Sequence, residues 1–225
     1  MQIINGKEVF TNIEELADPK YTALILIDVQ NDYISRGGIW EGLGEKFTLG
    51  QFVPNIKRVL DAARNSDILI AHIQFTVHPD FMAESPAFLR SRLIRSGYKS
   101  EDSINKLIPY CVDGTKGWQI IDELAPLPKE IVIKKHRPSS FIGTNLDVIL
   151  RSNNIKSVVL VGLVTQGCVL ATANDAQAFG YCPIVLRDCV ISHKPILHDA
   201  ALLVMSSDKD VVDSEEVIKV WDKKK

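Results

Sequence analysis

Cys168 has the residue type and the setting of a nucleophile. It follows the apolar segment 157–163 through the turn 164–167 and opens the alanine-rich segment 168–179. If that segment is a helix, the thiol lies in its first turn, where the helix dipole favours thiolate and lowers the thiol pKa. Unpaired N–H groups there can also hold an oxyanion. The alternative is a small buried apolar side chain, as most free cysteines are. We interpret the other three cysteines in that way: Cys111, Cys182 and Cys189.

Two charged residues end other apolar segments. Asp28 directly follows the apolar residues 23–27, where a carboxylate either caps a turn or faces a cleft. Lys135 ends the segment 130–135, where a lysine commonly extends to solvent. Lys134 fits the composition equally well. Because side chains alternate along a strand, only one of the two lysines can face a given site.

Other chemistry has weaker support. His72 ends an apolar segment and is open to three interpretations: a hydrogen-bonded structural residue, a substrate contact or a metal ligand. The histidines show no HExxH, Asp-x-His or zinc-finger spacing, so no metal site is predicted. The chain lacks the GxGxxG and GxxxxGK[ST] loops of nucleotide-binding proteins, so no cofactor is predicted. It also lacks the GxSxG elbow of serine hydrolases.

The segments that must position these residues alternate between two patterns. Short runs rich in Val, Ile and Leu are typical of buried strands; they lie at 23–29, 67–73, 130–135, 157–163, 183–188 and, more weakly, 210–213. Helical spacing or capping residues mark 51–65, 144–153, 168–179, 195–206 and 214–221. This alternation predicts an α/β fold with three αβα layers, built on a doubly wound, mostly parallel six-stranded sheet with helices on both faces. In such sheets the chemistry lies beyond the carboxyl ends of the strands, near the point where strand order reverses.

We expect a single domain, 1–225, with one insertion at about 75–118. The insertion has weak periodicity, which is typical of a functional loop, a lid or an oligomer contact, and its aromatic residues are candidates for that contact. A short helix is expected near 101–108.

The composition excludes several classes of function. Lys and Arg number 26 against 28 Asp and Glu, which gives a net charge of −2 and argues against a nucleic-acid partner. No apolar run approaches the roughly 18 residues of a membrane span. The first residues lack the pattern of a signal peptide, so we expect a cytoplasmic protein with reduced cysteines.

Three segments resemble the isochorismatase-like cysteine hydrolase superfamily in their order and spacing: LILIDVQNDY (24–33), VIKKHRPSSFIGTNLDVILR (132–151) and VVLVGLVTQGCVLATANDAQAFGY (158–181). The resemblance implies a catalytic triad of Asp28, Lys135 and Cys168, and its P-S-[AS]-F-x-G-T motif selects Lys135 over Lys134. It also implies a cis peptide bond between Leu163 and Val164, with an oxyanion hole formed by the N–H groups of Val164 and Cys168.

The resemblance further implies hydrolysis of a C–N bond through a thioester-type acyl-enzyme. Segments 36–44, 86–95 and 114–126 are most similar to the carbamoyl and ureido amidohydrolases, among them N-carbamoylsarcosine amidase, ureidoacrylate amidohydrolase and biuret hydrolase. We therefore expect a small amide, carbamoyl or ureido substrate and a homo-oligomer, either a dimer or a tetramer, as is common among relatives. The alternatives are a nicotinamidase or vinyl-ether hydrolase on the same fold, and a non-catalytic scaffold.

Candidate substrate-binding residues lie beside the motifs and in the insertion. Arg90 and Arg92 fit either a bidentate clamp on a substrate carboxylate or a solvated arginine face. Four further candidates are adjacent to motif residues: Gln30, Asn31, Tyr33 and Phe141.

Overall fold

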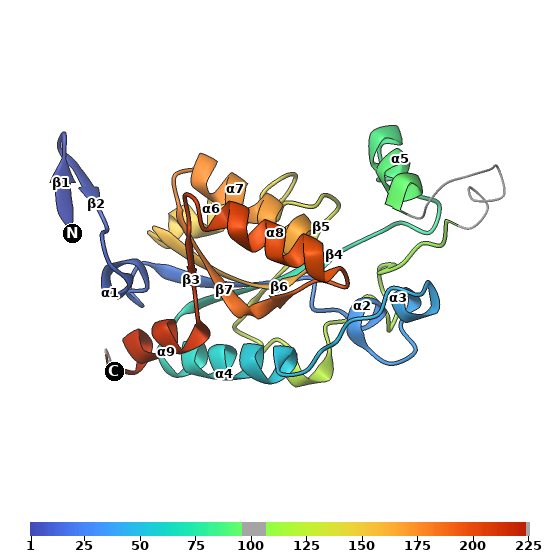
Figure 1. Ribbon diagram of the computed structural model, residues 1–225, viewed down its shortest axis with the longest axis horizontal. Coiled ribbons are helices and arrows are strands. Elements are labelled where there is room, and N and C mark those ends of the chain that lie inside the picture. The colour runs from blue at the N-terminus through green and yellow to red at the C-terminus, as the bar shows by residue number, and fades with distance from the viewer. Residues whose placement is uncertain (96–106, 224–225) are drawn as a thin grey trace.

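A six-stranded sheet forms the centre of the computed structural model, which describes residues 1–95 and 107–223 (Figure 1). Every neighbouring pair of strands is parallel, and the strand order is β5-β4-β3-β6-β7-β8. The strands are β3 (Thr22–Ile27), β4 (Leu69–Phe75), β5 (Ile131–Lys135), β6 (Ser157–Leu163), β7 (Cys182–Ile191) and β8 (Asp210–Val212). The predicted α/β fold with a parallel six-stranded sheet is confirmed.

Apolar residues that alternate along the central strands supply two separate cores. In β3, Leu24 and Leu26 belong to the core on one side of the sheet, whereas Ala23, Ile25 and Ile27 belong to the core on the other. Both β3 and β6 are buried along their whole length. Strands covered on both faces are uniformly apolar for this reason, which is the pattern that the sequence shows.

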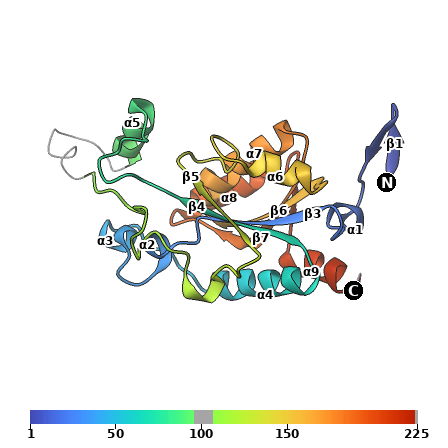
Figure 2. The same cartoon turned by 180° about the vertical axis from the view of Figure 1, so that it is seen from behind.

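Helices cover both faces of the sheet, as Figures 1 and 2 show. One layer holds α1 (Ile13–Leu16), α4 (Phe52–Asn65) and α9 (Ser214–Lys223), and the other holds α6 (Leu146–Ser152), α7 (Leu170–Ala178) and α8 (Pro195–Met205). Helix α4 buries Ile56, Val59 and Leu60 against the sheet. Their 3–4 spacing produces one apolar stripe on the helix.

The direction in which successive strands are added to the sheet reverses between β3 and β6, which lie side by side. Strands β4 and β5 lie on one side of β3, whereas β6, β7 and β8 lie on the other. Gly162 permits the close contact between β3 and β6, because a Cβ atom at that position would stand 2.1 Å from the carbonyl oxygen of Ile27. The short helices α2 (Asn31–Ile34) and α3 (Ile39–Gly42) lie beyond the carboxyl end of the sheet, as does α5 (Pro86–Arg95). The chain thus builds its loops and short helices around the end of the sheet where ligands bind in such folds.

Two elements differ from the sequence-based expectation. An antiparallel hairpin, β1 (Gln2–Ile4) and β2 (Lys7–Val9), projects from the sheet at the N-terminus. Its signal is the Asn5–Gly6 turn, in which both residues have positive φ, as a two-residue hairpin requires. The insertion contains the helix α5, which its weak periodicity did not indicate. The helix expected near 101–108 lies for the most part outside the described residues.

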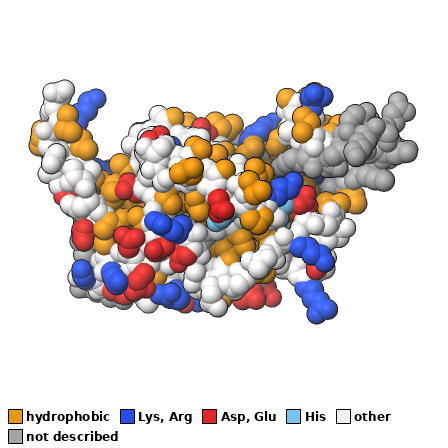
Figure 3. All heavy atoms as spheres, viewed as in Figure 1, with side chains coloured by type: hydrophobic (Ala, Val, Ile, Leu, Met, Phe, Trp, Pro, Cys, Tyr) orange, Lys and Arg blue, Asp and Glu red, His pale blue; other side chains and the backbone are white. Residues whose placement is uncertain are grey.

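The insertion does not present its described aromatic residues to solvent. Phe81, Phe88 and Trp118 pack against the core, and Tyr110 is buried. Exposed apolar side chains gather instead on α8, where Figure 3 shows a hydrophobic patch, and they are Ile196, Leu197, Leu203 and Val204. Among the residues that the structure describes, no helix has both the length and the apolar character needed to cross a membrane.

Candidate active site

Asp28 is the first residue beyond β3 and is completely buried. Its backbone has a φ of 56°, a left-handed conformation that is uncommon outside glycine and that collects at functional sites. Its N–H donates to the carbonyl of Ile73 at 3.0 Å, which continues the pairing of β3 with β4 for one further residue. The turn is therefore held from the neighbouring strand while the carboxylate is left for other partners.

Lys135 reaches Asp28 from the end of β5. Its Nζ lies 2.8 Å from Oδ2 of Asp28, and neither side chain is more than 1% exposed. The ammonium also donates to the carbonyl oxygen of Pro138 at 2.7 Å. Lys134 points to the opposite side, where its half-exposed Nζ pairs with Asp113 at 2.7 Å. The alternation along β5 thus gives one lysine to the site and the other to solvent.

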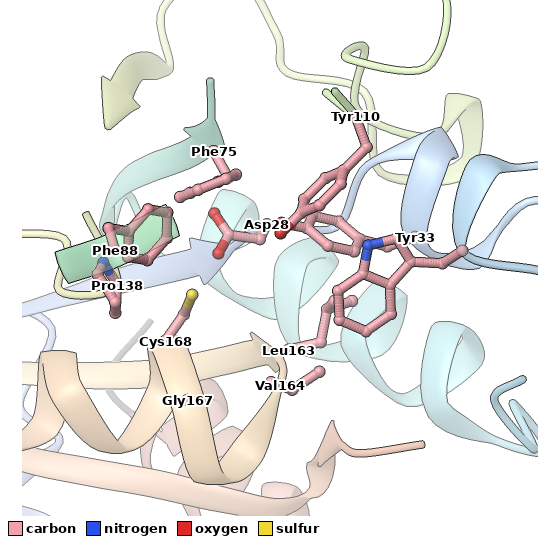
Figure 4. Close-up of a pocket in the computed structure, with 11 residues that line it drawn as sticks. Asp28, Tyr33, Phe75, Phe88, Tyr110, Pro138, Leu163, Val164, Gly167 and Cys168 are labelled. Atoms are coloured by element: carbon pink, nitrogen blue, oxygen red, sulfur yellow. The ribbon is translucent and has the colours of Figure 1, made fainter. Parts of the chain in front are cut away.

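Cys168 completes the group from β6. A π-helical turn, Thr165–Val169, joins the end of β6 to α7, and Cys168 is its fourth residue. Figure 4 shows the sulfur directed toward the carboxylate of Asp28. The peptide bond between Leu163 and Val164, which precedes this turn, is cis.

Burial and the neighbouring charges together set the pKa values of Asp28, Lys135 and Cys168. Burial raises the pKa of Asp28, although the charge of Lys135 and the thiol of Cys168 oppose the shift. Burial would lower the pKa of Lys135, but Asp28 and Cys168 outweigh it and raise that pKa. Burial and the nearby Asp28 raise the pKa of Cys168 to about 12. The expectation of a lowered thiol pKa was wrong, because loss of solvent and a neighbouring carboxylate outweigh the helix dipole.

Asp28 and Cys168 line a small cavity of about 50 Å³, and Lys135 lies behind Asp28, outside its lining. At roughly 10–15 Å³ for each water, it holds about four water-sized groups. Asp28 and Cys168 supply its reactive atoms, while Tyr33 is the one predicted substrate-binding residue on its wall. The remaining lining residues are Trp40, Phe75, Phe88, Tyr110, Pro138, Leu163, Val164 and Gly167.

The other motif-adjacent candidates do not line this cavity. The amide of Gln30 is fully buried and bonds to the backbone N–H and carbonyl of Phe75. Asn31 donates to the carbonyl oxygens of Lys116 and Gln119. Both amides hold the insertion against the sheet. Phe141 stacks with Phe179 and Tyr181 in the core on the α6 side.

The two arginines of α5 do not form a clamp in the cavity. Arg90 is exposed on the helix surface. Arg92 is buried, and its guanidinium stacks 5.0 Å from the ring centre of Phe81 and 4.4 Å from that of Tyr110. It donates to the carbonyl of Ile108 at 3.2 Å. Arg92 therefore supports Tyr110 from behind, while Tyr110 forms the wall.

His72 lies away from the cavity. It stands within β4, three residues before the strand ends, and its Nε2 lies 2.8 Å from a carboxylate oxygen of Glu130. Burial lowers the pKa of His72 although Glu130 opposes the shift, so the imidazole is neutral near pH 7 and donates to the carboxylate. Within residues 1–95 and 107–223, no group of three or more His, Cys, Asp or Glu side chains is arranged to hold a metal ion.

Most of the cavity wall was not identified from the sequence. Phe75 ends β4, where the rule of strand ends points to it, but an aromatic residue there is also a common core residue. Trp40 and Tyr110 come from a short helix and from the insertion, and they meet only because the fold brings these segments together. No local pattern marks such residues.

The sheet topology and the buried acid, lysine and thiol at its switch point define an isochorismatase-like hydrolase. The model of the isochorismatase domain matches residues 22–216, and the chain belongs to this family. The ureidoacrylate amidohydrolase RutB of Cronobacter turicensis is 33% identical over 190 residues, which cover 82% of this chain and 81% of that protein. The Agrobacterium fabrum RutB is 31% identical over 175 residues, or 76% and 75% of the two chains.

Solved structures show the same fold. A cysteine hydrolase from Pseudomonas syringae superposes with a TM-score of 0.77 at 20% identity, covering 92% of this chain and 95% of that one. The N-carbamoylsarcosine amidase of Thermoplasma acidophilum has a TM-score of 0.65 at 29% identity, with coverage of 87% and 97%.

Proposed function

We propose that the protein is a cysteine-dependent amidohydrolase that cleaves a C–N bond of a small amide, carbamoyl or ureido compound. The observation that carries the proposal is the buried pair of Asp28 and Lys135, 2.8 Å apart, in which Asp28 lines the same cavity as Cys168. A relative at 33% identity is named for ureidoacrylate hydrolysis, which supports the same substrate class here. The cavity volume of about 50 Å³ suits a head group of about four heavy atoms, the size of a ureido group.

The resting thiol needs a base, because its pKa of about 12 leaves it protonated near neutral pH. Asp28 takes that proton as the sulfur attacks the carbonyl carbon of the substrate. The electron pair of the carbonyl moves to its oxygen, and we assign the N–H groups of Val164 and Cys168 to hold the resulting oxyanion. Lys135 keeps the carboxylate in position and balances its charge.

The intermediate then collapses with cleavage of the C–N bond. The leaving nitrogen takes the proton from Asp28, and a thioester-type acyl-enzyme remains. Water adds to the acyl carbon as Asp28 accepts one of its protons, the C–S bond breaks, and the sulfur regains the proton. Atoms and charges balance over the cycle, and Asp28 acts as both base and acid.

The test is ammonia release from a panel of ureides, N-carbamoyl amino acids and primary amides. We expect turnover of at least one ureide or carbamoyl compound by the wild type, and a loss of at least about 1,000-fold in Cys168→Ala. Cys182→Ala is the matched control, because that thiol lies outside the cavity. Release of ammonia by Cys168→Ala at the wild-type rate would exclude the assigned nucleophile. A wild type inert toward the whole panel would favour the scaffold alternative.

A further inference from the structure

The indole N–H of Trp40 is a buried donor without an acceptor on the cavity wall. Trp40 is 8% exposed and lines the cavity, and its Nε1 has no hydrogen-bond partner among the described residues. The indole N–H groups of the other two tryptophans both have hydrogen-bond acceptors within the protein. Trp118 donates to the hydroxyl of Thr76 and Trp221 to the carbonyl of Ala17, both at 2.9 Å. Buried donors are nearly always paired, so this exception requires an explanation.

The ring of Trp40 is fixed in place by four neighbours. Tyr33 and Tyr110 meet it edge to face, with ring centres 4.9 and 5.8 Å away. Phe47 stacks on the indole with ring centres 5.9 Å apart, and His193 meets it edge to face with ring centres 5.2 Å apart. A ring packed on several sides cannot turn to find another acceptor, so its N–H has a set direction before any ligand arrives.

The backbone also holds Trp40 in position. Gly38 lies two residues before Trp40, and a Cβ atom at position 38 would lie 2.5 Å from the carbonyl oxygen of Asn31. The short helix α3 is therefore seated directly against α2, which carries Tyr33. This packing places the indole beside Tyr33 and Tyr110.

The position of the indole separates it from the reacting carbonyl. Figure 4 shows Tyr33 and Tyr110 on one side of Asp28, and Cys168 with Pro138 on the other. Trp40 packs on these two tyrosines and lines the same cavity, so the indole lies on their side of Asp28. The N–H groups of Val164 and Cys168 are already assigned to the oxygen of the carbonyl under attack, which leaves the indole N–H for a second oxygen.

We propose that Trp40 is a specificity-determining residue, whose indole N–H donates to a second acceptor oxygen of the substrate. This inference rests on the proposed function and narrows its substrate class. Compounds with a carboxylate or a second acyl oxygen, such as N-carbamoyl amino acids and acylureas, satisfy the donor. A simple primary amide such as propionamide does not, and it leaves the N–H buried and unpaired, which opposes its binding.

The kinetic test compares Trp40→Phe with wild type on two substrates. Phenylalanine retains an aromatic ring but removes the donor. We expect KM for an N-carbamoyl amino acid to rise about tenfold or more with kcat changed less than threefold, and KM for propionamide to fall, because the unpaired N–H that opposes its binding is gone. Trp118→Phe, which removes a donor outside the cavity, is the control and should leave both values near wild type. Equal changes for both substrates in Trp40→Phe would overturn the inference.

A binding test separates this inference from the proposed function. The three tryptophans give three indole ¹⁵N–¹H signals, and Cys168→Ala allows the carbamoyl substrate to be titrated without turnover. We expect the Trp40 signal to move downfield on saturation while those of Trp118 and Trp221 stay in place. Saturable binding with an unmoved Trp40 signal would overturn the inference and leave the proposed function standing. A wild type that releases no ammonia from any compound of the panel would overturn both.

Discussion

A buried thiol beside a buried carboxylate sets the chemistry of this site at the scale of single residues. In many cysteine enzymes a cation or helix dipole stabilises a resting thiolate. Here Asp28 lies against the sulfur and raises its pKa, and Lys135 only partly offsets that effect. In the proposed mechanism, proton transfer accompanies attack on the substrate, and we expect the free protein to protect its sulfur from reaction with other electrophiles.

Alkylation should reveal this protection. With a pKa of about 12, the Cys168 thiol should react slowly with iodoacetamide at pH 8, and its rate should keep rising with pH well beyond the ordinary thiol range. Asp28→Asn removes a negative charge that raises the thiol pKa, so this variant should be alkylated faster at pH 8 than wild type. Mass spectrometry of the labelled peptide measures both rates. A slower reaction in Asp28→Asn would contradict the assignment of Asp28 as the dominant charge at the sulfur.

Activity should depend on the ionisation of Asp28 on the acid side. The carboxylate must be ionised to accept the proton, and burial raises its pKa. As pH falls through that raised pKa, Asp28 becomes protonated and kcat/KM falls. The midpoint of the acid limb is expected above the value of an ordinary aspartate, and Lys135→Arg, which keeps a cation, should preserve a measurable limb. A flat profile down to pH 4 would show that no such base is required.

The neighbouring lysines of β5 form a matched pair for mutation. Lys135→Met removes the cation that holds Asp28 and should lower kcat/KM by at least about 100-fold. Lys134→Met removes a half-exposed cation on the opposite face, and it should stay within about twofold of wild type. Steady-state ammonia release measures both. Similar losses in the two variants would point to a general effect of charge rather than to the pair with Asp28.

At the scale of elements, the contact between β3 and β6 governs how the site is assembled. Gly162 has a φ of 119°, and a side chain there would meet the backbone of Ile27, the residue before Asp28. Gly162→Ala should therefore lower the free energy of unfolding by about 3 kcal/mol or more, from strain and from displacement of β3. Gly180→Ala is the control, since Gly180 has a φ of 91° with open space around it, and it should cost only about 1 kcal/mol. Urea denaturation compares them, and equal losses would mean that the close contact carries no cost of its own.

The position of the candidate site residues could be predicted from the ends of the apolar segments, whereas their catalytic role stays a prediction. The apolar runs placed Asp28, Lys135 and Cys168 at the carboxyl ends of three strands, and alternation showed that Lys134 and Lys135 face opposite ways. The choice between them came from a family motif, because composition treats the two lysines alike. Arg92 was misleading, since a guanidinium serves equally well as a ligand clamp or as a stacking partner, and only its burial against Tyr110 distinguishes these roles. The hairpin at Asn5 and Gly6 was available from the sequence and was overlooked.

At the scale of the whole molecule, we predict that the exposed apolar face of α8 is the contact of the expected homo-oligomer. Ile196, Leu203 and Val204 are 83%, 74% and 57% exposed, and they flank the small Ala200, so two antiparallel copies of the helix can pack around that residue. We expect light scattering to give at least twice the mass of 25.1 kDa. Leu203→Glu should shift the mass toward the monomer because it buries a charge in the interface. Leu127→Glu changes an isolated exposed leucine and serves as the control. A wild-type protein with the mass of a monomer would contradict this prediction.

The site draws its side chains from β3, β5 and β6, with β4 lying between two of them. A chain still emerging during synthesis thus has no competent centre until residue 168 has joined the sheet, and neither piece of a protein cut in the intervening loops can work alone. Turnover then reports on the integrity of the entire architecture. A slip of β5 by a single residue, in the direction that moves His136 into the position of Lys135, would take the lysine out of the site and stop turnover without removing one atom.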